Sequence, residues 1–146
     1  MLSQTAEYAL RTVVFLAQRS GESATRVDEI AAALAVPRNY LSKTLHRLAQ
    51  EGILSSTRGK GGGFRLAVPP EDLTLLTVIQ LFDRIGDGRQ CLLGRPVCSD
   101  AQACEAHASW KAVAAQVAGF FADTSVADLL AGRRTGPTRP VRGMHP

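Results

Sequence analysis

Residues 37–66, PRNYLSKTLHRLAQEGILSSTRGKGGGFRL, join a helical pattern to a glycine-rich turn. Leu41, Leu45 and Leu48 form a narrow apolar stripe at helical spacing, and Pro37 suits the first turn of such a helix. The run RGKGGG separates two short apolar alternations, and glycine adopts the backbone conformations of a tight turn most readily. This stretch therefore predicts a helix followed by a β-hairpin.

The residues before this stretch predict two further helices. The first has an apolar face that ends before Gly21 (Ala6, Ala9, Leu10, Val13, Val14 and Ala17). We expect Thr25 to begin the second helix, with Asp28 as the acidic partner of a capping box. Short helices, a basic third helix and a hairpin together indicate a winged helix-turn-helix, so the predicted fold is mainly α with a small β-hairpin wing.

The polar face of the third helix predicts contact with nucleic acid. It offers hydrogen-bonding groups and positive charge together, which base edges and phosphates both require. Arg58 and Lys60 lie at the predicted tip of the wing, where they could follow the sugar-phosphate backbone or enter a minor groove. The candidate DNA-binding residues are Arg38, Asn39, Tyr40, Ser42, Lys43, Arg58 and Lys60. The alternative is a helical domain that uses its hairpin for protein contacts.

The distribution of charge supports a polyanion-binding head on a different body. The chain has 146 residues and a net charge of +4. Residues 1–65 hold nine Lys/Arg and five Asp/Glu, residues 66–132 hold four and eight, and residues 133–146 hold four and none. Nucleotide binding by the glycine-rich turn is disfavoured, because no Ser or Thr follows Lys60 as in a Walker motif.

The sequence gives no indication of a membrane protein. It has no run of 18 apolar residues, and charged residues interrupt the apolar N-terminal segment, unlike a secretory signal. We therefore expect a cytoplasmic protein whose thiols stay reduced.

The second half predicts a helical arm that pairs with a second copy of the chain. Thr74 can cap a fourth helix, which Gly86 and Gly88 would end, and Ser125 with Asp128 can cap a short last one. Between them an apolar stripe recurs every three or four residues (Ala103, Ala106, Trp110, Val113, Val117 and Phe120). A homodimer formed through this long C-terminal dimerisation helix would place two recognition helices about 34 Å apart on a palindromic DNA site.

Three cysteines and a histidine lie within residues 91–107. Cys91, Cys98 and Cys104 have the spacing C-x6-C-x5-C, and His107 follows the last one at i+3, where both could share a helix face. Three thiolates and one imidazole can form a closed four-ligand site for zinc or an iron–sulfur cluster, although zinc ligands usually come in closer pairs. A disulfide is disfavoured by the odd number of cysteines, and buried structural cysteines are the other alternative.

Several segments together resemble the IscR/NsrR-type iron–sulfur transcription regulators. They are SQTAEYALR, IAAALAVPRNYLSKTLHRLAQEGIL, RGKGGGFRL, and the cysteine loop running into CEAHASW and DTSVADLL. The resemblance implies a homodimer in which a cluster near the dimer arm changes the affinity for promoter DNA. It also implies that Cys91, Cys98 and Cys104 are cluster ligands and that His107 is the histidine ligand of IscR-like members.

Two positions depart from the family pattern. The first cysteine gap is six residues, where five is commoner. Glu7 lies where some relatives use an N-terminal carboxylate from the other subunit as a ligand, although a glutamate there also favours the helix dipole. We favour His107 as the fourth ligand. A histidine ligand makes a 2Fe–2S cluster the expected type rather than a 4Fe–4S cluster. Some relatives also carry glutamate at the position of Ser42, so the base preference of this chain can differ.

The sequence thus predicts a homodimeric DNA-binding transcriptional regulator controlled by a cluster that senses redox state, nitric oxide or iron–sulfur status. We expect residues 1–70 to form the winged helix-turn-helix, residues 71–132 the cluster loop and dimerisation helix, and residues 133–146 a disordered basic tail. The alternatives are a structural zinc site and a loop that binds a small molecule or partner protein. An enzyme is disfavoured, because no orienting carboxylate or oxyanion donor can be identified beside a reactive cysteine.

Overall fold

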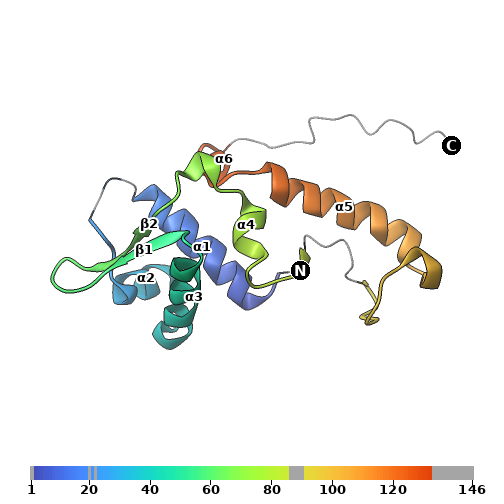
Figure 1. Cartoon of the computed structure of the whole chain (residues 1–146), viewed down its shortest axis with the longest axis horizontal. Coiled ribbons are helices and arrows are strands. Elements are labelled where there is room, and N and C mark those ends of the chain that lie inside the picture. Colours follow the sequence, from blue (N-terminus) through green and yellow to red (C-terminus); the bar gives the residue numbers. More distant parts are fainter. Residues whose placement is uncertain (1, 20, 22, 86–90, 133–146) are drawn as a thin grey trace.

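Three helices and a two-stranded antiparallel hairpin form the N-terminal head (Figure 1). The computed structural model describes residues 2–19, 21, 23–85 and 91–132. The elements of the head are α1 (Gln4–Gln18), α2 (Val27–Leu34), α3 (Arg38–Gln50), β1 (Leu54–Thr57) and β2 (Gly63–Leu66). The predicted fold class, mainly α with a small hairpin wing, is confirmed.

The turn between α2 and α3 sets the placement of α3. Ala35 ends α2 in the left-handed conformation, with φ 53°. The backbone N–H of Val36 then donates to Ala31 O at 3.0 Å, and the Val36 side chain is buried. Pro37 directly precedes the first residue of α3, so the chain turns within three residues. This close turn fixes the angle at which α3 leaves α2.

The prediction that Thr25 caps α2 is wrong. Its backbone N–H donates to Phe64 O at 2.9 Å, and its carbonyl accepts from the Phe64 N–H at 2.8 Å. Thr25 is therefore buried and forms an isolated antiparallel bridge with Phe64 of β2. Helix α2 begins two residues later. Asp28 forms an ion pair with Arg38 instead of a capping box. The backbone pairing with β2 has displaced the local cap.

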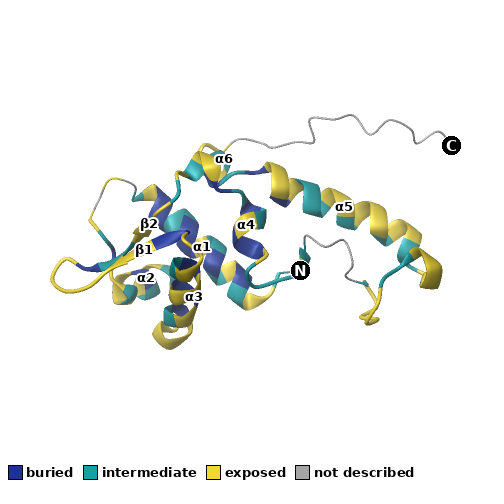
Figure 2. Cartoon of the chain, viewed as in Figure 1, coloured by how far each residue is buried: buried dark blue, intermediate teal, exposed yellow. Residues whose placement is uncertain are grey.

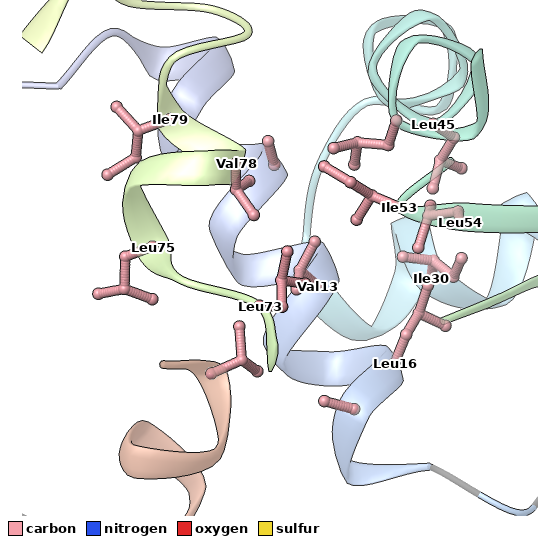
Figure 3. Packing of buried hydrophobic residues seen from close by; sticks show 14 of the residues in the cluster. Val13, Leu16, Ile30, Leu45, Ile53, Leu54, Leu73, Leu75, Val78 and Ile79 are labelled. Atoms are coloured by element: carbon pink, nitrogen blue, oxygen red, sulfur yellow. The ribbon is translucent and has the colours of Figure 1, made fainter. Parts of the chain in front are cut away.

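One hydrophobic core joins α1, α3 and β1 to α4 (Leu75–Ile79) and α6 (Val126–Leu130). Figure 3 shows Val13, Leu45, Ile53 and Val78 pointing into this core. The predicted stripe Leu41, Leu45 and Leu48 is fully buried. Burying each leucine contributes about 1.5–3 kcal/mol relative to exposure, so these three side chains hold α3 firmly on the head.

The C-terminal elements return to the head through backbone pairing. The Leu75 N–H donates to Thr124 O at 2.9 Å, and the Val126 N–H donates to Leu73 O at 2.8 Å. The predicted caps are confirmed: Thr74 accepts from the Thr77 N–H, and Ser125 with Asp128 forms a full capping box. The fourth helix is shorter than predicted, because it ends at Ile79. The glycines expected to end it, Gly86 and Gly88, lie outside the described residues.

Helix α5 (His107–Asp123) projects away from the head (Figure 1). Figure 2 shows it largely exposed or half-buried along its length, in contrast to the dark-blue faces of the head helices. Phe121 is its single buried residue, whereas Val113 and Phe120 are 47% and 44% exposed. The predicted role of α5 in dimerisation stays a prediction.

Three other predictions concern membrane spans, the C-terminal tail and the domain boundary. Among the described residues, none of the helices is long and apolar enough to cross a membrane. The predicted basic tail, residues 133–146, lies outside the described residues. The predicted boundary at residue 70 also stays a prediction, and the core draws side chains from both sides of it.

Gly63 is the position at which the wing approaches the rest of the head most closely. A Cβ atom there would lie 2.3 Å from Thr25 O, and the residue has φ +140°. We expect Gly63→Ala to break the Thr25–Phe64 pairing and to lower the free energy of unfolding by about 1–3 kcal/mol, as for other strained backbone positions. Urea denaturation measures this loss.

Gly61 provides the matched control in the same hairpin. It also has a positive φ, +76°, but a Cβ atom there would meet nothing within 4 Å. Gly61→Ala should cost only the conformational strain, about 1 kcal/mol. Equal losses for the two variants would show that the close approach of Gly63 to Thr25 does not stabilise the wing.

Candidate nucleic-acid interface and metal-ligand loop

The outer face of α3 presents the predicted DNA-binding groups to solvent. Arg38, Asn39, Tyr40 and Lys43 are exposed, and Ser42 is half-buried. The leucine stripe on the opposite side of the same helix is buried, so the polar face is directed outward by the packing of the core. Such a face can donate and accept hydrogen bonds in a DNA groove.

Two of these residues also position the helix within the head. The Arg38 guanidinium pairs with Asp28 at the start of α2. The Tyr40 hydroxyl hydrogen-bonds with Thr5 Oγ1 at 2.8 Å, and its ring packs edge-on against Tyr8 with centroids 5.6 Å apart. The sequence patterns did not reveal these contacts, because the partners are distant along the chain and their type carries no periodic signal.

The wing is attached to α3 at the base of the hairpin. Arg58 and Lys60 are exposed at the tip of the hairpin, where the Gly62 N–H donates to Gly59 O at 2.9 Å. At its base, Phe64 packs edge-on against the ring of His46 with centroids 6.0 Å apart. The cationic tip is therefore carried on a hairpin fastened both to α3 and to the segment before α2.

The four candidate metal ligands form two pairs near the first residue of α5. Cys91 Sγ lies 3.8 Å from Cys104 Sγ, and Cys98 Sγ lies 3.4 Å from His107 Nδ1. All three cysteines are free thiols and half-buried. Within the part of the chain that the structure describes, no three Cys, His, Asp or Glu side chains already meet the spacing of a bound metal ion. The donor types fit a thiolate-preferring centre, and the two pairs would have to close on one another to form it.

The environment of the thiols affects their ionisation in opposite directions. The backbone N–H of Arg95 lowers the pKa of Cys91, with smaller contributions from the Leu93 N–H, the Cys104 thiol and the charge of Arg95. Desolvation raises the pKa of Cys98, and the negative charges of Cys91 and Cys104 add to that effect. The thiolate is the form that binds metal, so Cys91 is more readily available as a metal ligand than Cys98.

His107 is held on both ring nitrogens. It is the first residue of α5, its backbone N–H donates to Cys104 O at 3.0 Å, and its side chain is 11% exposed. Its Nε2 lies 2.8 Å from Asp100 Oδ1, while Nδ1 faces Cys98. Cys104 precedes α5, so the expectation that Cys104 and His107 share a helix face is wrong.

Asp100 and Lys111 are site residues that the sequence reasoning missed. Hydrogen bonds from His107 and then from Lys111 hold the pKa of the Asp100 carboxyl below its usual range. Both residues help to line a cavity of about 160 Å³ beside Cys98 and His107. Two features of the sequence could have indicated these residues. Asp100 is a carboxylate within the cysteine loop, and Lys111 lies at i+4 from His107, on the same helix face.

Glu7 lies in the first turn of α1, where it is exposed. A carboxylate at this position stabilises the positive end of the helix dipole. Its use as a metal ligand by the other subunit stays a prediction.

Comparisons with known proteins identify the family to which the chain belongs. The family model Rrf2, described as iron-dependent transcriptional regulator, matches residues 2–132. A protein of Aquifex aeolicus named as an HTH-type transcriptional regulator is 33% identical over 132 residues, which cover 89% of this chain and 91% of that protein. The HTH-type transcriptional regulator IscR of Vibrio atlanticus is 27% identical, over 88% of this chain and 74% of its own length.

The fold is also found in a solved structure. CymR (YrzC), the global cysteine regulator of B. subtilis, superimposes with a TM-score of 0.76 at 22% identity, over 90% of this chain and 97% of that one. The predicted resemblance to IscR/NsrR-type regulators is confirmed, and the relatives are regulators rather than enzymes, as expected. The match over residues 2–132 and the winged helix-turn-helix head together show that the chain is a DNA-binding transcriptional regulator of the Rrf2 family.

Proposed function

We propose that this regulator binds promoter DNA as a homodimer and that an iron–sulfur cluster held by Cys91, Cys98, Cys104 and His107 controls its affinity. The observation that carries the proposal is the pairing of these four donors near the first residue of α5, with Cys91 3.8 Å from Cys104 and Cys98 3.4 Å from His107. A bound cluster would supply a redox-active centre whose state depends on iron, oxidants or nitric oxide.

The structure favours His107 over Glu7 as the fourth ligand. His107 comes from the same loop region as the cysteines and directs Nδ1 at a thiol, whereas Glu7 belongs to the first turn of α1. A histidine ligand supports a 2Fe–2S rather than a 4Fe–4S cluster, as in the IscR-like members that the sequence resembles. A zinc site remains the competing use of the same donors.

DNA recognition is assigned to α3 and the wing. Four side chains of α3 would read the major groove, with Arg38 near the start of the helix: Asn39, Tyr40, Ser42 and Lys43. Arg58 and Lys60 would bind the backbone or a minor groove with the wing. The fixed connection between the wing and α3 supports their use on one DNA segment.

The path from the loop to the head runs through α5. His107 begins that helix, and Phe121 near its other end is buried against the head core. The backbone pairing of Thr124 and Val126 with Leu75 and Leu73 then fixes the helix end to the head. A change in the loop could therefore alter how α5 meets a second copy, and so the spacing of two recognition helices.

The dimer is proposed to form along α5. A 17-residue helix that projects from the head with Val113 and Phe120 exposed leaves an apolar stripe uncovered in the single chain. The same stripe on a second copy is complementary to it by symmetry. Two recognition helices placed about 34 Å apart would then suit a palindromic site.

Iron and sulfide content tests the ligand set. Protein purified without oxygen should contain iron and sulfide in equal amounts and absorb visible light. Cys91→Ser, Cys98→Ser, Cys104→Ser and His107→Ala should lose most of the cluster, because each removes one donor, while Glu7→Ala should retain it. The measurement is a chemical iron and sulfide count together with the absorption spectrum.

Three other outcomes would change the assignment. Colourless protein with one zinc per chain would replace the cluster with a structural zinc site. Loss of the cluster in Glu7→Ala but not in His107→Ala would move the fourth ligand to the other subunit. Full clusters in both variants would overturn both choices of fourth ligand.

The salt dependence of DNA binding tests the interface. Lys60→Gln should weaken binding to all sequences alike and reduce the slope of log K against log salt by about 0.9, as expected for one lost phosphate contact. Asn39→Ala should instead cost about 1–3 kcal/mol on the preferred sequence alone, because it removes a base contact. Fluorescence anisotropy on a duplex enriched from a random pool measures both effects.

Arg84→Gln is the matched control for the charge change. Arg84 is exposed and lies after α4, outside α3 and the wing. The Arg84→Gln variant should leave both the DNA affinity and the slope of log K against log salt close to those of the wild type. A Lys60→Gln variant that matched this control would remove the wing from the DNA interface.

A further inference from the structure

We infer that His107 binds the metal centre through Nδ1 and that Asp100, held in place by Lys111, is the positioning residue that determines this choice of nitrogen. The inference rests on the proposed function, since it concerns the metal centre proposed above. Its basis is the chain of contacts from Cys98 through the imidazole to the carboxylate and the ammonium group.

The two ring nitrogens of His107 have different surroundings. Nε2 lies 2.8 Å from Asp100 Oδ1, and Nδ1 lies 3.4 Å from Cys98 Sγ. A neutral imidazole carries one N–H, and an ionised carboxylate can only accept a hydrogen bond. The proton is therefore placed on Nε2, and Nδ1 presents its lone pair towards the thiol. Metal binding requires that lone pair, so the nitrogen available to a metal is the one that already faces a cysteine.

Lys111 fixes the carboxylate that selects this tautomer. Its Nζ donates to Asp100 Oδ1 at 2.9 Å and to Oδ2 at 3.1 Å. Lys111 lies one turn after His107 on α5, so the same helix carries the imidazole and the group that orients its partner. Asp100 itself lies in a 3-10 turn, Asp100–Gln102, that Ser99 caps. The Ser99 cap thus holds Asp100 in place within the loop. Helix α5 holds His107 and Lys111.

The exposure of these groups argues for positioning rather than for fold stability. The side chains of Asp100 and Lys111 are 75% and 62% exposed, whereas that of His107 is 11% exposed. An ion pair so open to water is screened and stabilises a fold little. A hydrogen bond to a nearly buried ring, by contrast, restricts the orientation of that ring. Carboxylates placed in this way behind a histidine ligand typically change metal affinity 10–100-fold when they are removed.

The first experiment uses the full-length chain stripped of metal by a chelator. Nitrogen-15 NMR of the His107 ring should show an almost pure Nε2–H tautomer in the wild type. Asp100→Ala should give a mixture of tautomers, and Lys111→Ala should give a smaller change in the same direction. Glu105→Ala is the matched control, because Glu105 is an exposed carboxylate of the same loop that pairs with Arg95 instead.

The second experiment uses the chain loaded anaerobically with iron and sulfide. Asp100→Ala should lose iron to a chelator 10–100-fold faster than the wild type, and Glu105→Ala should match the wild type. Asp100→Asn, whose amide oxygen can still accept from Nε2–H, should restore part of the difference. In the reduced wild type, histidine labelled with nitrogen-15 at Nδ1 alone should show strong coupling to the cluster in pulsed electron paramagnetic resonance.

Each outcome bears on either the inference or the proposed function. Strong coupling from Nε2, or an Asp100→Ala variant equal to Glu105→Ala in both tautomer and iron loss, would overturn the positioning role while leaving the cluster in place. A wild type that takes up neither iron and sulfide nor cobalt(II) would overturn the ligand assignment together with the proposed function. The wild type should also melt within a degree or two of Asp100→Ala, since the exposed pair contributes little to stability.

Discussion

Two backbone hydrogen bonds attach the segment that carries the cysteine loop and α5 to the head. The pairing of Leu73 and Leu75 with Val126 and Thr124 brings together residues about fifty positions apart in sequence. The flanking leucine and valine side chains are buried in the same core as α1 and α3. The chain is therefore held to the head at Leu75 and again at Thr124. The cysteine loop and α5 lie between these two fixed positions. A buried backbone group that loses its partner costs about 1–3 kcal/mol, so this attachment is not easily released.

The head is organised so that its polar surface is a consequence of its core. Burial of Leu41, Leu45 and Leu48 leaves α3 only one direction in which to present Asn39 and Lys43. The wing is fastened separately, by the bridge between Thr25 and Phe64. Because neither constraint involves a charged side chain, the proposed DNA-reading face can be rich in cations without weakening the packing beneath it.

The periodic and capping patterns of the sequence were sufficient for most of the fold. The leucine stripe, the glycine-rich hairpin and the Thr74 and Ser125 caps were all predicted from local spacing, and local interactions do determine them. Thr25 was misassigned because its backbone pairs with a strand almost forty residues away, which a local capping rule does not consider. The start of α5 was placed too early for a similar reason. Its apolar spacing continues into the loop, but Cys104 and its neighbours lie outside the helix.

The candidate site was predictable in composition but not in geometry. The clustering of three cysteines and His107 identified the candidate donors, since thiols and imidazoles are uncommon and their proximity is visible in the sequence. The division into Cys91–Cys104 and Cys98–His107 depends on how the loop folds, which no spacing rule specifies. The Asp100–Lys111 contact was missed because a carboxylate and a lysine are ordinary on a surface, and only their position behind the imidazole gives them significance.

We propose that DNA affinity depends on the cysteine loop, although this loop lies far from α3 in the single chain (Figure 1). The most direct measurement compares one anaerobic preparation before and after its iron is removed, on duplexes enriched with each form, at the same salt concentration. We expect at least a tenfold change in Kd, about 1.4 kcal/mol, on one of these duplexes, with no change in helix content. Equal dissociation constants for the two forms on every duplex would contradict it.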